Sequence, residues 1–304
     1  MRFNIDFVSK RKWWYALSLL VIIVGLIAMT IQHPPLNFGI DFTGGNILQV
    51  KFHQEVNTEQ VRGVLEDIKM GNSSIQESDN NQFIIRTVEL DENQVNNVIS
   101  NLRSKLGDLD VERNDKVGAT IGHELTVKGI KAMLIAWVLM VIYITIRFEF
   151  LSGIAAIIAL IHDILITLGF FAIFRWEIDS TFVAALLTII GYSINDTIVI
   201  FDRIRENFKQ RNKETVEETV NRSINQTLVR SLNTSLTTAA ALLALMLLGG
   251  ETTRIFALAM LIGVISGTYS SIFIASPLWV DFRNMARNRR RQSVSGKSRV
   301  RNAH

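Results

Sequence analysis

Long apolar runs alternate with short polar segments along most of the chain. The runs occupy residues 13–31, 132–146, 150–174, 180–201, 232–250 and 255–280. Most of them reach the ~20 residues that an α-helix needs to cross the hydrocarbon layer of a bilayer. The run at 132–146 is the shortest, but the long side chains of Lys128 and Lys131 can reach the interface, so the helix there can be longer than its apolar part. The pattern predicts a polytopic α-helical membrane protein with six transmembrane helices.

The first apolar run is expected to remain in the protein as a transmembrane helix. A cleaved signal peptide would also start with a basic cluster such as Lys10-Arg11-Lys12. This run is long, however, and it ends in Gln32-His33-Pro34-Pro35 without a small-residue cleavage site.

One polar stretch, residues 32–127, is large enough to fold as a separate domain. Leu48, Val50 and Phe52 alternate with polar residues as in a half-buried strand, and the spacing of apolar residues over 61–68 predicts a helix that Thr58 could cap. A second strand is predicted over 83–88, a second amphipathic helix over 95–106 and a further strand around 111–117. Strand–helix–strand repeated twice predicts a ferredoxin-like α+β domain between helices one and two. The pair Gly44-Gly45 is expected to form a tight turn before the first strand, because the Lys and Ser/Thr of a phosphate-binding loop are missing.

Composition and charge fit this interpretation. The chain is 48% hydrophobic, has a mean hydropathy of +0.25 and contains no cysteine, which excludes disulfides, thiolate metal clusters and cysteine nucleophiles. Twenty of the 32 Lys and Arg residues lie in the N-terminus, the 147–149 turn, the 202–231 connector and the tail from 283, against two in the opposite short loops. The positive-inside rule therefore predicts that both termini are cytoplasmic and that the large loop is periplasmic. For the basic tail, attraction to membrane lipids is the favoured interpretation, and a contact with a partner protein, the ribosome or nucleic acid is the alternative.

Ionisable groups are almost absent from the predicted helices, so the exceptions are informative. They are His162 and Asp163 in the third helix and Asn195-Asp196 in the fourth. An Asp at the centre of a membrane helix costs about 2.5–3.5 kcal/mol, which a partner, water or protonation must offset. Arg230 opens the fifth helix, and because helices four and five are joined on one side, Asp196 and Arg230 could pair.

Structural explanations compete with functional ones at these positions. Asp196 is only about 8 Å along the helix from Phe201, so it could lie near the cytoplasmic surface. His162 and Asp163 could serve a hydrogen bond between helices or proton transfer. The spacing of Gly263 and Gly267 indicates close helix packing, and the amphipathic connector at 202–231 is expected to form an interfacial helix.

Several motifs together resemble the SecF subunits of the bacterial protein-export machinery, in the SecD/SecF family. The resemblance covers roughly residues 3–282. It rests on FGIDFTGG after the first helix, His162-Asp163 in the third, GYSIND in the fourth, DRIREN directly after it, and Arg230 with the SLTT run in the fifth.

This resemblance implies a resistance–nodulation–division type fold in the bacterial inner membrane, with SecD supplying the other half. It further implies partnership with a SecY-containing translocation channel, its accessory subunits and the translocating preprotein, with protons as the coupling ion. The family's proton-relay positions fall on Asp196 and Arg230, and Asn195, Asp163 and His162 are further candidates for the relay.

Two other functions remain open at this stage. The chain could be a structural clamp that stabilises the channel and SecD, or half of a proton-driven transporter for small molecules or lipids. An enzyme is not expected, and neither a metal, a cofactor nor a nucleic-acid partner is expected, since no nucleophile–base pair, ligand cluster or phosphate loop stands in a fitting context. The predicted organisation is a cytoplasmic N-terminus (1–12), helix one (13–31), the periplasmic domain (32–127), helices two to six (128–282) and a basic cytoplasmic tail (283–304).

Overall fold

The computed structural model describes residues 5–78, 81–147, 149–211 and 214–301. The chain divides into two compact units, a helical unit of Met1–Asn37 with Met133–His304 and an α+β unit of Phe38–Ala132. Each unit has its own hydrophobic core. The last three residues of the predicted basic tail lie outside the described residues.

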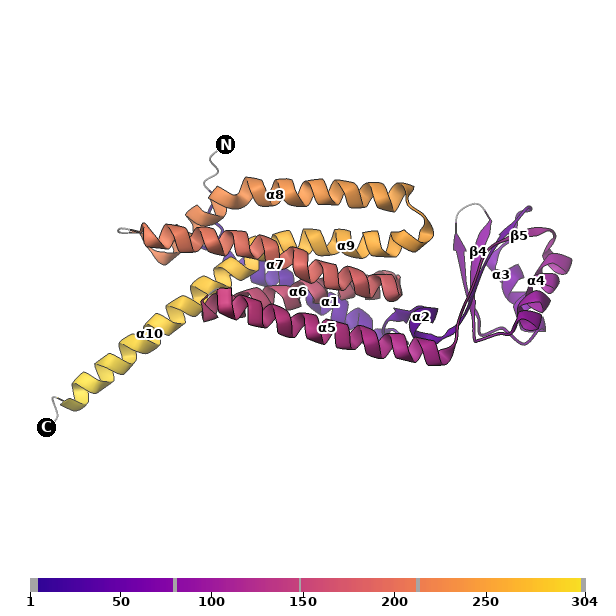
Figure 1. The fold of residues 1–304 in the computed structure, drawn as a ribbon, viewed down its shortest axis with the longest axis horizontal. Coiled ribbons are helices and arrows are strands. Elements are labelled where there is room, and N and C mark those ends of the chain that lie inside the picture. The colour runs from indigo at the N-terminus through magenta and orange to yellow at the C-terminus, as the bar shows by residue number, and fades with distance from the viewer. Residues whose placement is uncertain (1–4, 79–80, 148, 212–213, 302–304) are drawn as a thin grey trace. The chain divides into compact units, whose positions relative to one another are not determined.

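Long apolar helices make up the helical unit (Figure 1). Within the described residues, six stretches are long and apolar enough to cross a membrane, which confirms the predicted number. The second begins well before its apolar run, as predicted, and the sixth is continuous through a short π-helical segment. The elements are α1 (Arg11–Ile31), α5 (Ala119–Arg147), α6 (Phe150–Phe174), α7 (Ser180–Lys209), α8 (Val216–Leu248), α9 (Glu251–Ser270), η1 (Ser271–Ala275) and α10 (Ser276–Arg301), with two-residue strands β1 (Asn37–Phe38) and β6 (Glu177–Ile178).

The connector at 202–231 differs from the predicted single interfacial helix. Its first part continues α7 to Lys209, and its second part is the beginning of α8. The new helix starts at Val216 because Thr215 and Glu218 form a capping box, in which each side chain bonds the other residue's backbone N–H. The amphipathic residues therefore belong to two long helices that extend beyond their apolar parts.

Glycines allow close packing between helices. A Cβ at Gly263 would lie 2.3 Å from side-chain atoms of Ile189, and a Cβ at Gly267 would lie 3.0 Å from the Cβ of Ser193. These two glycines therefore place α9 directly against α7, which confirms the packing interpretation of their spacing.

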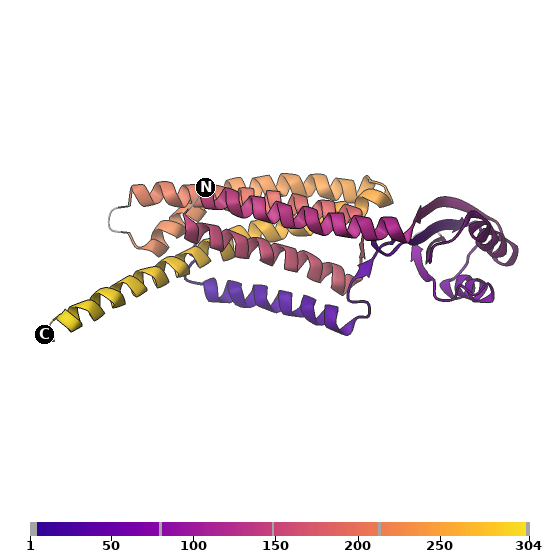
Figure 2. The ribbon, with the colours of Figure 1, turned by 60° about the horizontal axis from the view of Figure 1, so that its bottom comes forward.

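Polar contacts join the chain segments at one end of the helical unit (Figures 1 and 2). Arg11 at the beginning of α1 forms an ion pair with Asp281 of α10 at 2.8 Å. The side chain of Asn221 in α8 accepts hydrogen bonds from the backbone of Phe7 and Val8. The segments that carry most basic residues thus gather at the same end.

The α+β unit contains a four-stranded antiparallel sheet of order β3-β4-β2-β5. Alternate residues of β2, including Leu48, Val50 and Phe52, form a core with the apolar faces of two helices, α3 and α4. Figure 2 shows both helices on one side of the sheet. The elements are α2 (Ile40–Thr43), β2 (Gly45–Phe52), α3 (Thr58–Asp67), β3 (Ser74–Ser78), β4 (Gln82–Thr87), α4 (Glu92–Leu106) and β5 (Leu109–Val117).

Three local details refine the prediction for this unit. Asn57 caps α3 instead of Thr58, because its side chain accepts a hydrogen bond from the backbone N–H of Gln60 in a capping box. Strand β3 was not predicted, since its sequence SIQES is too polar to show alternation. Gly44 and Gly45 have φ values of 72° and 130°, so the chain turns at this pair, with Gly44 capping α2 and Gly45 beginning β2.

Candidate functional site

The two buried carboxylates of the helical unit differ in their hydrogen bonding. Asp163 lies in α6 and is completely buried. Its Oδ1 accepts from Ser266 at 2.7 Å and lies 2.9 Å from Nδ1 of His162. Its Oδ2 accepts from Ser193 at 2.6 Å and from Ser270 at 2.8 Å. The carboxylate therefore has four polar contacts, two at each oxygen.

Two neighbouring helices supply the three serine contacts. Ser193 comes from α7, and Ser266 and Ser270, one helical turn apart, come from α9. The π-helical segment η1 starts directly after Ser270, and its first residue, Ser271, is 2.8 Å from the hydroxyl of Thr197 in α7. The segment thus brings successive hydroxyls of the sixth span against α6 and α7.

His162 supports this arrangement from the adjacent position. Its ring stacks on Tyr269, with 6.0 Å between ring centroids and 24° between planes. The Tyr269 hydroxyl in turn donates to the backbone oxygen of Trp14 in α1. His162 and Asp163 are therefore part of a hydrogen-bonded core that joins α1, α6, α7 and α9.

An ionised carboxylate offers about four acceptor positions. Serine hydroxyls donate to both oxygens of Asp163, and in the fourth contact, with Nδ1 of His162, the donor depends on the histidine tautomer. Satisfied buried polar networks of this kind hold helices in a single arrangement. The geometry of Asp163 and His162 favours the interhelical hydrogen bond, which was one of the two alternatives left open by the sequence.

Asp196, in α7, is buried but only partly hydrogen-bonded. Its Oδ1 accepts a hydrogen bond of 2.6 Å from Ser231 in α8. Its Oδ2 is buried and has no hydrogen-bond partner among the described residues, and 9% of the residue is exposed. One oxygen of Asp196 is therefore available for a proton, a water molecule or a partner group.

Arg230 does not pair with Asp196 as the sequence suggested. Among the described residues no ion pair within 4.0 Å joins the two side chains, and Arg230 is exposed. The reason is the helical period, since consecutive residues point about 100° apart around the axis. Ser231 therefore supplies the direct contact to Asp196, whereas Arg230 lies beside it and acts on the carboxylate through its charge without an ion pair.

Exposed polar side chains lie near Asp196 on the surface of the helical unit. Asn195 is exposed on α7 next to Asp196, and Arg230, Asn233, Thr234 and Thr237 are exposed along α8. Exposed polar groups within apolar helices are unfavourable against lipid tails. This face of α7 and α8, called the polar face below, is thus suited to contact another protein or water.

Four serines of these sites were not singled out by the sequence: Ser193, Ser231, Ser266 and Ser270. Two of them could have been found from the sequence, because Ser266 and Ser270 share one face of a membrane helix with Gly263 and Gly267, the face expected to pack against another helix. Ser193 and Ser231 lie close in sequence to Asp196 and Arg230, but nothing in the chain alone shows which way they face. Within the described residues, no group of three or more His, Asp or Glu side chains could hold a metal ion.

Comparison with known families identifies related proteins along nearly the whole chain. Residues 97–285 match the model of the protein export membrane protein SecD/SecF C-terminal family, and residues 33–56 match the SecD/SecF GG motif. The protein translocase subunit SecF of Acidaminococcus fermentans is 45% identical over 284 residues, which cover 91% of this chain and 96% of that one. The same subunit of Sebaldella termitidis is 38% identical over 281 residues, covering 90% and 91%.

Solved structures agree with the sequence comparisons. The crystal structure of SecDF, a translocon-associated membrane protein from Thermus thermophilus, matches with a TM-score of 0.85 and 36% identity over 93% of this chain. A SecDF structure in a super-membrane-facing form matches with a TM-score of 0.71 and 34% identity. The chain spans only 39–40% of the length of these SecDF chains. On this evidence the chain is a membrane protein that belongs to the SecD/SecF family of protein-export membrane proteins, and its full-length relatives are SecF subunits.

Proposed function

We propose that this chain is the SecF-type half of a proton-driven export complex in the bacterial inner membrane. In this proposal SecD supplies the other half, and the pair acts with a SecY-containing channel and its accessory subunits on the translocating preprotein. The full-length relatives are translocase SecF subunits, and the similar SecDF chain is more than twice as long as this one, which leaves room for a second half. We further propose that the chain is a transporter subunit and not an enzyme, and that it needs no cofactor besides protons and no nucleic-acid partner.

The orientation is part of this proposal. The end of the helical unit that gathers the N-terminal segment, the α7–α8 connection and α10 carries most of the basic residues, which favours the cytoplasmic side for both termini. The α+β unit then lies on the periplasmic side. Its element order β2-α3-β3-β4-α4-β5 and strand order β3-β4-β2-β5 support assignment to the ferredoxin-like type.

One observation carries the proton coupling: Asp196 is a buried carboxylate with an unpartnered oxygen. A proton that binds Oδ2 removes the charge to which Ser231 donates, and so weakens the contact between α7 and α8. An interhelical hydrogen bond of this kind within a membrane contributes about 1 kcal/mol. One charge crossing the membrane supplies about 2.3 kcal/mol per 100 mV, which is enough to offset that contact. Movement of α7 against α8 would then be transmitted to the periplasmic unit.

Arg230 has a revised part in this proposal. It is exposed on α8 and forms no ion pair with Asp196, although its charge acts on that carboxylate, so its guanidinium is available to a group of SecD. Asn195 lies on the same face and could hold water that leads to Asp196. Asp163 and His162 keep the surrounding helices in place and do not exchange protons during the cycle.

Proton flux into vesicles that contain this chain with SecD tests the assignment. Asp196→Asn is expected to abolish the flux and the proton-dependent part of preprotein export. Asp202→Asn is the matched control, because it makes the same change on the same helix at an exposed ion pair with Arg147. It should leave the flux unchanged.

Two outcomes would replace this function with the alternatives. Full export and unchanged flux in Asp196→Asn would favour a structural clamp for the channel. Proton flux that depends on a small molecule or lipid, with no effect on preprotein export, would favour a transporter of that substrate.

The polar face provides a separate test of the SecD partner. The natural chain has no cysteine, so a cysteine introduced at Asn195 or Thr234 is the sole thiol. Co-assembly with SecD should protect these thiols from a water-soluble reagent and from a lipid-soluble one. A cysteine at Leu248, which is 89% exposed at the far end of α8, is the comparison site. Equal labelling of Asn195→Cys and Thr234→Cys with and without SecD would show that the partner does not cover this face.

A further inference from the structure

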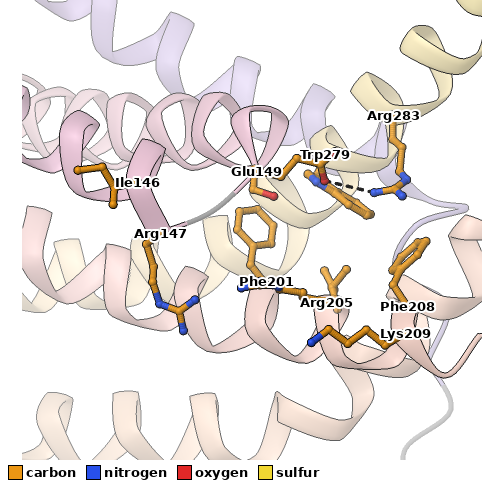
Figure 3. Close-up of a pocket in the computed structure, with 11 residues that line it drawn as sticks. Ile146, Arg147, Glu149, Phe201, Arg205, Phe208, Lys209, Trp279 and Arg283 are labelled. Atoms are coloured by element: carbon orange, nitrogen blue, oxygen red, sulfur yellow. Dashed lines mark hydrogen bonds and ion pairs between the residues drawn. The ribbon is translucent and has the colours of Figure 1, made fainter.

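A pocket of about 530 Å³ lies at the basic end of the helical unit, away from both buried carboxylates. It is formed where the end of α5, the beginning of α6, the last turns of α7 and the first turns of α10 meet. Figure 3 shows basic side chains and aromatic rings around it. Its charged and indole-bearing lining residues include Arg147, Glu149, Arg205, Lys209, Trp279 and Arg283.

The pocket has an excess of positive charge. Arg147 forms an ion pair with Asp202 and Arg283 forms one with Glu149, each at 3.3 Å. The exposed side chains of Arg205 and Lys209 have no ion-pair partner among the described residues. After the two pairs are balanced, two positive charges remain at the pocket.

A buried donor also lacks a partner. Trp279 is 3% exposed, and its indole Nε1–H has no hydrogen-bond acceptor in the part of the chain that the structure describes. Its ring lies 5.4 Å from the ring of Phe208 and 4.9 Å from the guanidinium of Arg283, and these two groups also contact each other at 4.6 Å. Buried N–H groups without an acceptor are rare, so an acceptor that is absent from the protein itself is expected here.

Apolar surface leads from the pocket to the predicted bilayer. Ile146, which lines the pocket, is 82% exposed, and Phe150 at the beginning of α6 is 67% exposed. Ile146 lies in the last turn of α5 and Phe150 is the first residue of α6. Because both positions are ends of membrane-spanning helices, this surface lies at the level where acyl chains meet headgroups. Trp and Arg side chains are common at this level because each combines an apolar body with a polar end.

We propose that this pocket binds the phosphate headgroup of an anionic phospholipid. The phosphate oxygens accept hydrogen bonds from Arg205, Lys209 and the Trp279 indole, and an acyl chain lies along Ile146. Basic pockets between membrane helices on the cytoplasmic side commonly bind such headgroups. The pairing of Glu149 with Arg283 matters, because a free carboxylate at this place would repel the phosphate. The lipid would hold α5, α6, α7 and α10 together at one end, and this role is independent of proton coupling at Asp196.

Native mass spectrometry of the full chain in detergent can test this inference. Phosphatidylglycerol is the probe and phosphatidylcholine is the zwitterionic comparison. The unmodified chain should retain one phosphatidylglycerol molecule in preference to phosphatidylcholine. The double variant Arg205→Gln/Lys209→Gln should weaken its retention roughly 30-fold, because each basic side chain near a membrane surface contributes about fivefold.

A matched control separates the pocket from general surface charge. Arg287→Gln/Arg289→Gln removes the same charge from exposed positions of α10 that do not line the pocket. It should leave the bound lipid unchanged within about twofold. Equal losses in the two double variants, or equal retention of both lipids by the unmodified chain, would overturn the proposal.

Two further arms identify the ligand and the donor. Inorganic phosphate at millimolar concentration should not displace the lipid, because it has no acyl chain; displacement would show that the pocket binds free phosphate instead.

Trp279→Phe keeps a ring for stacking but removes the N–H, and should lower lipid retention several-fold without unfolding the chain. Unchanged retention in Trp279→Phe would show that the indole is not a ligand donor.

Discussion

Asp163 and Asp196 are both buried carboxylates in membrane-spanning helices, but their surroundings are opposite. Asp163 has four polar contacts, three from serines of α7 and α9 and one from its neighbour His162, whereas Asp196 has one contact, from Ser231. Asp163 has no exposed surface, and Asp196 lies next to the exposed Asn195. The difference separates a carboxylate whose acceptor positions are filled from one that can still take a proton or a water.

This comparison shows that burial alone does not indicate function. A buried charge whose hydrogen bonds are all satisfied mainly specifies how helices pack. A buried charge that is left half-satisfied is unfavourable for stability and is a typical feature of functional sites.

The largest effect is expected for Asp163→Asn. An amide brings an NH₂ group toward hydroxyl groups that now donate to a carboxylate, and it removes the charge that all four contacts share. Removing one partner of a buried charged network typically costs about 3–5 kcal/mol. Thermal unfolding in detergent should show a large decrease in the midpoint temperature. Asp196→Asn, the paired variant, should change the free energy of unfolding by about 1 kcal/mol or less. Equal destabilisation by the two substitutions would remove the contrast.

Gly263→Ala tests the packing that holds the Asp163 contacts together. The new Cβ would lie 2.3 Å from side-chain atoms of Ile189, so this side chain or α9 itself must shift. Overpacking of this kind costs about 1–3 kcal/mol. The matched control is Gly191→Ala on α7, where no atom lies within 4 Å of the added Cβ. Unfolding of the isolated chain should distinguish the two, and a loss of stability in Gly191→Ala as large as that in Gly263→Ala would contradict the packing argument.

Single hydroxyl deletions compare the two sites contact by contact. Ser231→Ala removes the one hydrogen bond of Asp196, and Ser270→Ala removes one of the four contacts of Asp163. Each should cost about 1 kcal/mol in unfolding experiments, since an interhelical hydrogen bond in a membrane is worth about that much. Only Ser231→Ala is expected to change proton flux. A change of flux in Ser270→Ala and none in Ser231→Ala would reverse the assignment.

The smallest effect is expected for an acid–base pair in the α+β unit, His53 and Asp110. This pair is exposed to water, in contrast to the two buried carboxylates. A hydrogen bond and the negative charge of Asp110 raise the pKa of His53, and His53 lowers the pKa of Asp110. The His53 contribution to stability is therefore complete below its unfolded pKa of about 6.5 and is lost as pH rises through its higher folded pKa. The Asp110 contribution is present above its unfolded pKa of about 3.9 and is lost as pH falls through its lower folded pKa.

NMR titration of the His53 ring can measure this shift. The midpoint should lie above 6.5 in the natural chain and should fall toward 6.5 in Asp110→Asn. Glu112→Gln, at a neighbouring position in the same strand, is the control and should leave the midpoint unchanged. A midpoint of 6.5 or below in the natural chain would contradict the proposed interaction.

Much of the fold could be predicted from the sequence because it follows from period and length. The six apolar spans and the alternation of Leu48, Val50 and Phe52 each reflect a property of a single segment. Strand β3 was missed because Ile75 is its only apolar residue, which is too little to show alternation. The connector was misassigned because amphipathic spacing is the same in one interfacial helix and in the ends of two long helices.

The site was less predictable, because it depends on how helices are rotated against one another. The sequence identified Asp163 and Asp196 by their unfavourable burial, but it could not show that Ser231 and not Arg230 faces Asp196. One residue along a helix changes the direction by about 100°, which decides between an ion pair and a hydroxyl contact. Similarly, the shell around Asp163 combines α7 and α9, which are far apart in the chain.

Infrared difference spectroscopy after a pH jump tests the contrast most directly, because it detects the C=O band of a protonated carboxyl group. The complex with SecD should show a band from a buried carboxylic acid, and this band should be lost in Asp196→Asn. Selective ¹³C labelling of Asp would confirm that the band arises from an aspartate. The contrast predicts that no second buried carboxylic-acid band remains in the variant. Persistence of the full band in Asp196→Asn would show that another group takes the proton and would contradict the central assignment.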